Sequence, residues 1–164
     1  MIYGFNAGEV FKIALDIEEN GHLFYKKAQE KTDDPDVKKV FEDLGLEELK
    51  HIERFKALMG QLPESSTQPT VWDPEDKIDQ YLKMMADMHV FRKGDDVEAK
   101  LAQAQDTVSA LKLAIQFEKD SIVFFSEMQA MADNEEGRTN IGQLVREEQE
   151  HLKKLSLQLM KTSK

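Results

Sequence analysis

Apolar residues recur every three or four positions along most of this chain of 164 residues, which is the period of an amphipathic α-helix. No run of alternating β-branched residues competes with that pattern, so the sequence predicts an all-α protein. Residues typical of helix caps divide the pattern into separate helices. Four long helices are expected, with caps at Asn6, Asp34, Asp106 and either Asp133 or Asn134, and with ends at about Ala28, Met59, Met131 and Leu159.

The connection between the second and third long helices is much longer than the other two. Residues 61–72 have the composition of a loop, a further helix is expected from Asp73 to about Gly94, and a short helical piece follows at about 96–104. The short connections make the first two and the last two long helices antiparallel hairpins. We therefore expect one domain over residues 1–164, with hairpins at about 6–60 and about 106–161 and a helical crossover at about 61–105.

The two hairpins resemble each other at a constant offset of 100 residues and without a gap. The stretch KIALDIE at 12–18 matches KLAIQFE at 112–118, and LGLEELKH at 44–51 matches LVREEQEH at 144–151. An internal repeat of this kind indicates a duplicated helical hairpin.

The repeat places acidic residues and histidines on the apolar faces of the helices. At about 100° per residue, Glu18 lies within the apolar arc of the first long helix, and Glu118 lies within that of the third. The frame Glu-x-x-His recurs in the second and fourth helices, where both of its side chains fall on the core face as neighbours. Six polar side chains are thus expected inside the bundle: Glu18, Glu48, His51, Glu118, Glu148 and His151.

A carboxylate in such a core costs several kcal/mol unless it is protonated, paired or bound to a metal. No Lys or Arg falls near these glutamates on the helical wheels, so ion pairing is disfavoured. Four carboxylates and two neutral imidazoles carry a charge that two divalent ions would cancel. The pattern therefore predicts a two-metal site, and a polar core network without metal is the alternative.

One further pair has the same spacing without the same placement. Glu19 and His22 have no counterparts at Lys119 and Ile122, and Glu19 points about 100° away from Glu18. We interpret His22 as a residue at the edge of the helix interface.

Composition narrows the chemistry further. The absence of cysteine excludes disulfides, thiolate metal sites and iron–sulfur clusters, so any metal must use oxygen and nitrogen ligands. The net charge of -10 argues against nucleic acid and anionic membranes as partners. No long apolar run and no signal-peptide pattern is present, so we expect a cytoplasmic protein.

The six core residues resemble the ligand set of the ferritin-like di-iron carboxylate proteins. Within that superfamily, the segments IEENGHLFYKKA, FEDLGLEELKHIERF and FEKDSIVFF resemble proteins of the rubrerythrin type. The resemblance implies a ferritin-like four-helix bundle and two iron ions, although manganese or zinc also suits such ligands. It further implies that Glu18 and Glu118 are terminal ligands, that Glu48 and Glu148 are bridging ligands, and that His51 and His151 each bind one metal.

The chain departs from rubrerythrins in two respects. It lacks their cysteine-ligated rubredoxin domain, so electrons would have to come from a separate protein. It also lacks their extra carboxylate one turn after the third-helix ligand, where Ser121 stands, and its repeat equivalent is Gly21. We expect these small residues to leave space beside the metals. The resemblance also implies that Tyr25 orients Glu118 or another ligand by a hydrogen bond, and Phe125 occupies the equivalent position.

The leading hypothesis is a di-iron oxidoreductase of the rubrerythrin type that reduces peroxide or O2 with electrons from an external electron-transfer protein. Iron storage with ferroxidase activity is an alternative, because bacterioferritins share a paired Glu-x-x-His set, although the long crossover and the short segment after His151 disfavour a cage. A di-iron hydroxylase acting on a small molecule is another alternative.

An interaction module without catalysis is the last alternative. The expected crossover helix carries an apolar stripe that suits either ordinary core packing or the docking of a partner. We expect a homodimer from the family resemblance. The stripe consists of Tyr81, Met84, Met85, Met88 and Phe91.

Overall fold

The computed structural model describes residues 7–62, 77–92, 95–132 and 134–164, with the side chains of residues 78 and 79 excepted. These ranges contain six α-helices and no strand. The all-α prediction is confirmed. The helices are α1 (Ala7–Lys31), α2 (Pro35–Gly60), α3 (Lys77–Met88), α4 (Val97–Gln103), α5 (Thr107–Met131) and α6 (Glu135–Thr162).

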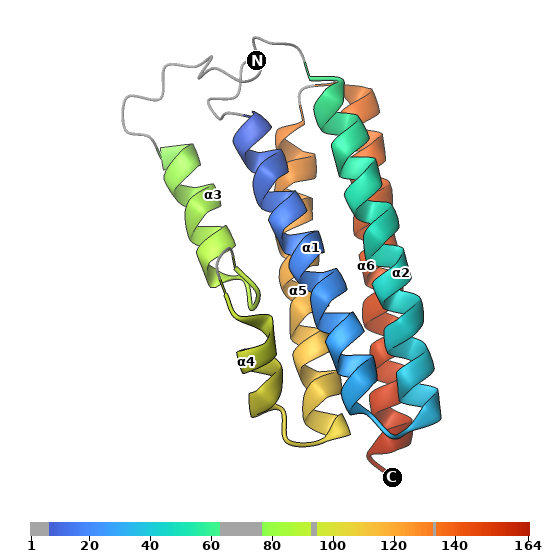
Figure 1. The fold of residues 1–164 in the computed structure, drawn as a ribbon. Helices are drawn as coiled ribbons and strands as arrows, with labels where there is room; N and C mark the ends of the chain where they lie inside the picture. Colours follow the sequence, from blue (N-terminus) through green and yellow to red (C-terminus); the bar gives the residue numbers. More distant parts are fainter. Residues whose placement is uncertain (1–6, 63–76, 93–94, 133) are drawn as a thin grey trace.

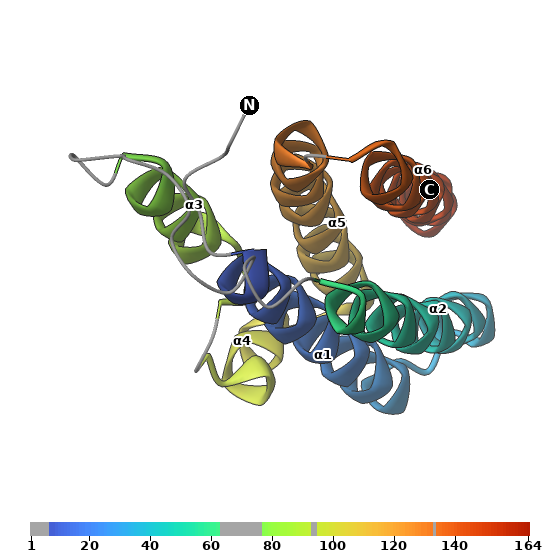
Figure 2. The same ribbon diagram turned by 90° about the horizontal axis from the view of Figure 1, so that it is seen from above.

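Four long helices form the bundle, and the two short ones lie outside it. Helices α1 and α2 pack along their length as one hairpin, and α5 and α6 pack as the other (Figure 1). Seen from above, α3 and α4 flank the bundle, with α4 against α1 and α3 against α5 (Figure 2). This is the predicted arrangement of two hairpins and a helical crossover.

The predicted caps account for where three of the long helices begin, namely α2, α5 and α6. The Asp34 carboxylate accepts hydrogen bonds from the backbone N–H groups of Asp36 and Val37 at 2.9 and 3.2 Å. Asp106 and Asn134 accept in the same way from backbone N–H groups three residues later. Asn6 and Asp133 lie outside the described residues. Helix α1 ends three residues later than expected, at Lys31.

The crossover helix ends earlier than the sequence suggested, because side chains take the backbone groups that would continue it. We expected a helix to about Gly94, but α3 ends at Met88. The N–H of Val90 donates to the Asp120 carboxylate at 2.8 Å, and the Lys100 ammonium donates to the Val90 carbonyl. Since an α-helix needs those groups for its own bonds, the chain turns here. The expected start at Asp73 lies outside the described residues.

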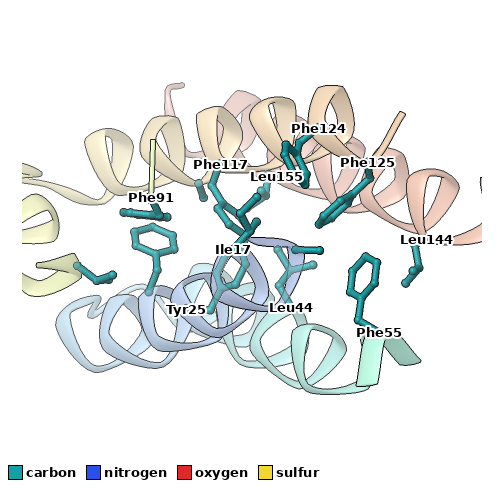
Figure 3. Packing of buried hydrophobic residues seen from close by; sticks show 14 of the residues in the cluster. Ile17, Tyr25, Leu44, Phe55, Phe91, Phe117, Phe124, Phe125, Leu144 and Leu155 are labelled. Atoms are coloured by element: carbon teal, nitrogen blue, oxygen red, sulfur yellow. The ribbon is translucent and has the colours of Figure 1, made fainter. Parts of the chain in front are cut away.

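Aromatic rings fill much of the space between the hairpins, and one of them comes from the crossover. The Phe91 ring is fully buried and lies 5.6 Å from the Phe117 ring between centroids (Figure 3). The centroid of the Phe24 ring lies 5.0 Å from that of Phe91. The Phe91 ring therefore anchors the crossover in the core. The apolar stripe expected on the crossover does not lie wholly in the core. Phe91 is buried, but Met84 and Met88 are 50% and 69% exposed.

The space expected beside Gly21 is filled, so that expectation is wrong. A Cβ atom added at Gly21 would lie 2.8 Å from Cε1 of Phe117 and closer still to Cζ. The ring of Phe117 on α5 packs directly on the backbone of α1. Glycine is therefore required here by the close approach of the two hairpins.

We predict that Gly21→Ala lowers the free energy of unfolding by about 1 kcal/mol or more. Overpacking a buried ring costs about 1–3 kcal/mol, and the better helix propensity of alanine returns up to about 1 kcal/mol. Urea titration measures the difference. Gly60→Ala is the matched control, because nothing lies within 4 Å of a Cβ added there. If Gly21→Ala were stabilised as much as Gly60→Ala, the close packing of the Phe117 ring on Gly21 would be contradicted.

Candidate metal centre

All six polar residues predicted for the core lie in the bundle interior. Helix α1 supplies Glu18 and α5 supplies Glu118, while α2 and α6 each supply one Glu-x-x-His pair. The four glutamates and His51 are fully buried, and His151 is 2% exposed. Each of these side chains projects from the apolar face of its own helix, so helix packing alone brings them together.

The six residues form two overlapping groups. In each group, one ligand-type atom from every residue lies within 4.8 Å of the others. Glu48 and Glu148 belong to both groups, as bridging residues would. The Glu18 position is formed by Glu18, Glu48, His51 and Glu148, and the Glu118 position is formed by Glu48, Glu118, Glu148 and His151.

The cluster has many more polar atoms than hydrogen bonds. Nine buried side-chain oxygen and nitrogen atoms in the described part of the chain have no hydrogen-bond partner, and all belong to these six residues. Such atoms are rare in folded proteins, because each costs about 1–3 kcal/mol. Seven are carboxylate oxygens, and the other two are the Nδ1 atoms of His51 and His151. This donor set fits two divalent cations.

Burial and mutual charge shift the pKa values of the cluster in opposite directions. Burial raises the pKa of Glu18 and of Glu118 well above the ordinary value. Burial also acts on Glu148, but its ion-pair contacts with both imidazoles, at 2.8 and 3.0 Å from their Nδ1 atoms, outweigh burial and lower its pKa. The neighbouring carboxylates overcome burial at the histidines, so the pKa of His51 rises, and that of His151 rises to about 12. Without metal, protons supply the positive charge that the cluster needs.

Tyr25 lies against one of the carboxylates, as the resemblance to rubrerythrins implied. Its buried hydroxyl donates a hydrogen bond to Oε1 of Glu118. Burial and the charge of Glu118 raise the pKa of Tyr25 well above its ordinary value, so the hydroxyl keeps its proton. The equivalent Phe125 has no hydroxyl and packs against Phe55 at 5.1 Å between ring centroids. Among the residues that the structure describes, only the Glu118 position therefore has a tyrosine donor.

We predict that Tyr25→Phe weakens metal binding at the Glu118 position about 10-fold to 100-fold, because hydrogen bonds that orient ligands typically contribute this much. Competition with a chelator of known affinity measures the loss. Tyr81→Phe is the control, since that ring is 36% exposed on α3. An unchanged affinity in Tyr25→Phe would mean that the hydroxyl forms its hydrogen bond to Glu118 in the metal-free protein but does not contribute to metal binding.

Glu147, which was not predicted from the sequence, lies behind one of the histidines. Nε2 of His51 donates to the Glu147 carboxylate at 3.0 Å, and Arg54 binds the same carboxylate oxygen at 3.0 Å. This bond fixes the imidazole with Nδ1 facing the cluster. The only signal was its place next to Glu148 in EEQEH, and the equivalent Glu47 pairs with Lys50 on its own helix.

A second polar pair borders the cluster from the crossover. His89 is 3% exposed, and its Nε2 lies 3.1 Å from Oγ of the fully buried Ser121. Nδ1 of His89 accepts from the backbone N–H of Phe91 at 3.1 Å. The repeat gave no signal for His89, because the crossover has no counterpart in the duplicated unit.

The second pair with the Glu-x-x-His spacing, Glu19 and His22, lies outside the cluster. His22 is half-buried and its Nδ1 lies 2.8 Å from the carbonyl oxygen of Gly45, while Glu19 is exposed. His22 therefore joins α1 to α2 at the edge of their interface, as the sequence suggested.

A four-helix bundle with two overlapping groups of buried carboxylates, each with one histidine, defines a di-metal carboxylate protein. The family model for rubrerythrin matches residues 9–159, so this chain belongs to the rubrerythrin family. The family and the buried cluster together support metal binding of the di-iron type.

The fold is similar to the crystal structure described as that of a ferritin-like diiron-carboxylate protein from Thermotoga maritima, with a TM-score of 0.74, 23% identity and 100% of each chain covered. That likeness confirms the ferritin-like fold. A search of curated proteins finds no match. In the described part of the chain, no helix is long and apolar enough to cross a membrane.

Proposed function

We propose that this protein is a di-iron oxidoreductase of the rubrerythrin type, which reduces peroxide or O2 with electrons from a separate protein. The observation that carries the proposal is the pair of overlapping groups that share Glu48 and Glu148. Two metals held by common carboxylates would lie close enough to act on one small substrate. The family supports iron over manganese or zinc, which the same ligands also suit.

Each residue of the cluster has a distinct part in this proposal. Glu18 and His51 would hold one iron, Glu118 and His151 would hold the other, and Glu48 and Glu148 would hold both. When bound, the iron pair supplies two electrons to a bound oxygen species. Glu147 would keep Nδ1 of His51 turned toward its iron.

The surroundings of the cluster suit the same chemistry. The buried rings of Phe55, Phe117 and Phe125 exclude bulk water from the cluster. The sequence contains no cysteine and so has no thiolate-bound redox centre of its own. We therefore assign the supply of electrons to a separate carrier protein.

Metal analysis and rapid-mixing kinetics test the proposal together. Protein purified without added metal or chelator should contain about two iron ions per chain. After anaerobic reduction, its iron absorption should return on mixing with hydrogen peroxide or with O2, and the faster reagent identifies the substrate. Two zinc ions, or reduced iron that neither reagent oxidises, would overturn the proposed activity.

A further inference from the structure

The two metal positions differ at one equivalent place in the repeat. Ser121 follows Glu118 by one helical turn on the buried face of α5, so the two side chains are neighbours. The equivalent residue after Glu18 is Gly21, and the ring of Phe117 covers it. Only the Glu118 position therefore has a hydroxyl at this place.

The protons of the pair formed by His89 and Ser121 can be assigned from geometry. The N–H of Phe91 donates to Nδ1 of His89, so Nδ1 carries no proton. The imidazole proton is then on Nε2, which donates to Oγ of Ser121 at 3.1 Å. Because the serine oxygen acts as the acceptor in this bond, the hydroxyl proton of Ser121 is left to donate elsewhere.

No protein group in the described part of the chain takes that proton. Two other serines on the long helices, Ser126 and Ser156, donate to the carbonyl four residues earlier at 2.6 and 2.7 Å. Ser121 makes no such bond within the described ranges. One turn earlier on the same buried helical face, Oε2 of Glu118 has no hydrogen-bond partner.

Neighbouring residues hold the backbone that follows His89. Asp120 accepts from the N–H of Val90 at 2.8 Å, and Lys100 donates to the carbonyl of the same residue. The adjacent Phe91 ring is buried between the hairpins. The backbone next to His89 is therefore fixed, as the orientation of a hydrogen-bonding group requires.

We propose that Ser121, positioned by His89, donates a hydrogen bond to a small anion or oxygen species bound at the Glu118 position. The inference rests on the proposed function for the presence of metals and assigns substrate binding to one of the two positions. Ser121 is the binding residue, and His89 is a positioning residue that keeps the serine oxygen occupied as an acceptor. At the Glu18 position the corresponding residue is Gly21, which has no hydroxyl, and Phe117 covers its backbone.

Azide binding to the iron-loaded, oxidised protein tests the inference. Ser121→Ala should weaken azide binding about tenfold, because a hydrogen bond to a charged group is lost. Ser121→Thr should bind azide nearly as tightly as the wild type, since threonine keeps the hydroxyl. Ser126→Ala should bind azide like the wild type, because that serine donates to the carbonyl of its own helix. Absorbance titration gives the dissociation constants, and mass spectrometry gives the iron content of every sample.

Two variants of His89 test its positioning role. His89→Phe should weaken azide binding several-fold, because nothing then prevents the Ser121 hydroxyl from donating to its own helix. His89→Gln should retain most of the affinity, because its amide can still donate to the serine. Equal weakening in both variants would overturn the positioning role and leave only a packing effect.

The outcomes separate this inference from the proposed function. Full iron content with unchanged azide affinity in Ser121→Ala overturns the inference while the proposed function stands. Weaker azide binding in a protein that reduces neither peroxide nor O2 supports the inference and overturns the proposed reaction. A wild-type protein that takes up no metal overturns both.

Discussion

Replacing Glu48 with alanine is expected to abolish the binding of both metal ions, whereas Glu18→Ala is expected to remove only one. Glu48 belongs to both groups of the cluster, and Glu18 belongs to one. Without Glu48, each position keeps two carboxylates and one histidine, and one of the two carboxylates that would neutralise both cations is lost. Metal content by mass spectrometry should fall from about two ions per chain to near zero in Glu48→Ala, and to about one in Glu18→Ala.

The control for this comparison is Glu53→Ala, two turns or less from the site on the same helix. Glu53 is exposed and pairs only with Lys56 on its own helix in the described structure, so its removal changes the net charge without touching the cluster. It should keep the wild-type metal content. If Glu48→Ala retained about one ion per chain, the shared role of Glu48 would be wrong and the two positions would be independent.

The sequence was sufficient for the bundle and for the six residues of the cluster, and the reason is the duplication. A glutamate on an apolar helical face is ambiguous alone, but Glu18 and Glu118 coincide after an offset of 100 residues. Each Glu-x-x-His pair fixes its own geometry within one turn of helix. Since helical periodicity decides which face is buried, placing these residues inside required no knowledge of how the hairpins pack.

Contacts between the hairpins were beyond the reach of the sequence. Glu147 on α6 contacts His51 on α2, whereas the equivalent Glu47 pairs with Lys50 on its own helix. Nothing in the local sequence pattern distinguishes these two glutamates. The Phe117 ring on Gly21 depends in the same way on the distance between α1 and α5. Such contacts are set by the packing of whole helices, which periodicity does not specify.

The crossover shows the same limit for an element outside the repeat. The pattern of apolar residues continues past Met88, so it predicted a longer helix. Instead, the helix ends where the backbone of Val90 forms tertiary hydrogen bonds with Asp120 and Lys100, and His89 lies in the core. Local propensity gives way where buried partners satisfy the backbone better.

Removal of both metal ions is expected to lower the free energy of unfolding by about 8 kcal/mol, or about 4 kcal/mol per site, when the comparison is made with metal at about a thousand times its dissociation constant. The folded state binds the ions and the unfolded chain does not hold the six ligands together, so the binding energy adds to stability. Urea titration with excess iron under anaerobic conditions, and then with chelator, measures the difference. Glu48→Ala should show no such shift.

The same experiment shows what the cluster costs the apoprotein. Neither oxygen of Glu18 has a hydrogen-bond partner, although the residue is fully buried. In the presence of chelator, Glu18→Leu should therefore be more stable than the wild type by about 1–3 kcal/mol, because a leucine of similar size removes the unsatisfied group. With excess iron the order should reverse, because the variant has lost one metal. A variant that is less stable than the wild type under both conditions would mean that Glu18 belongs to a satisfied polar network, in which case the core was built for structure and not for metal.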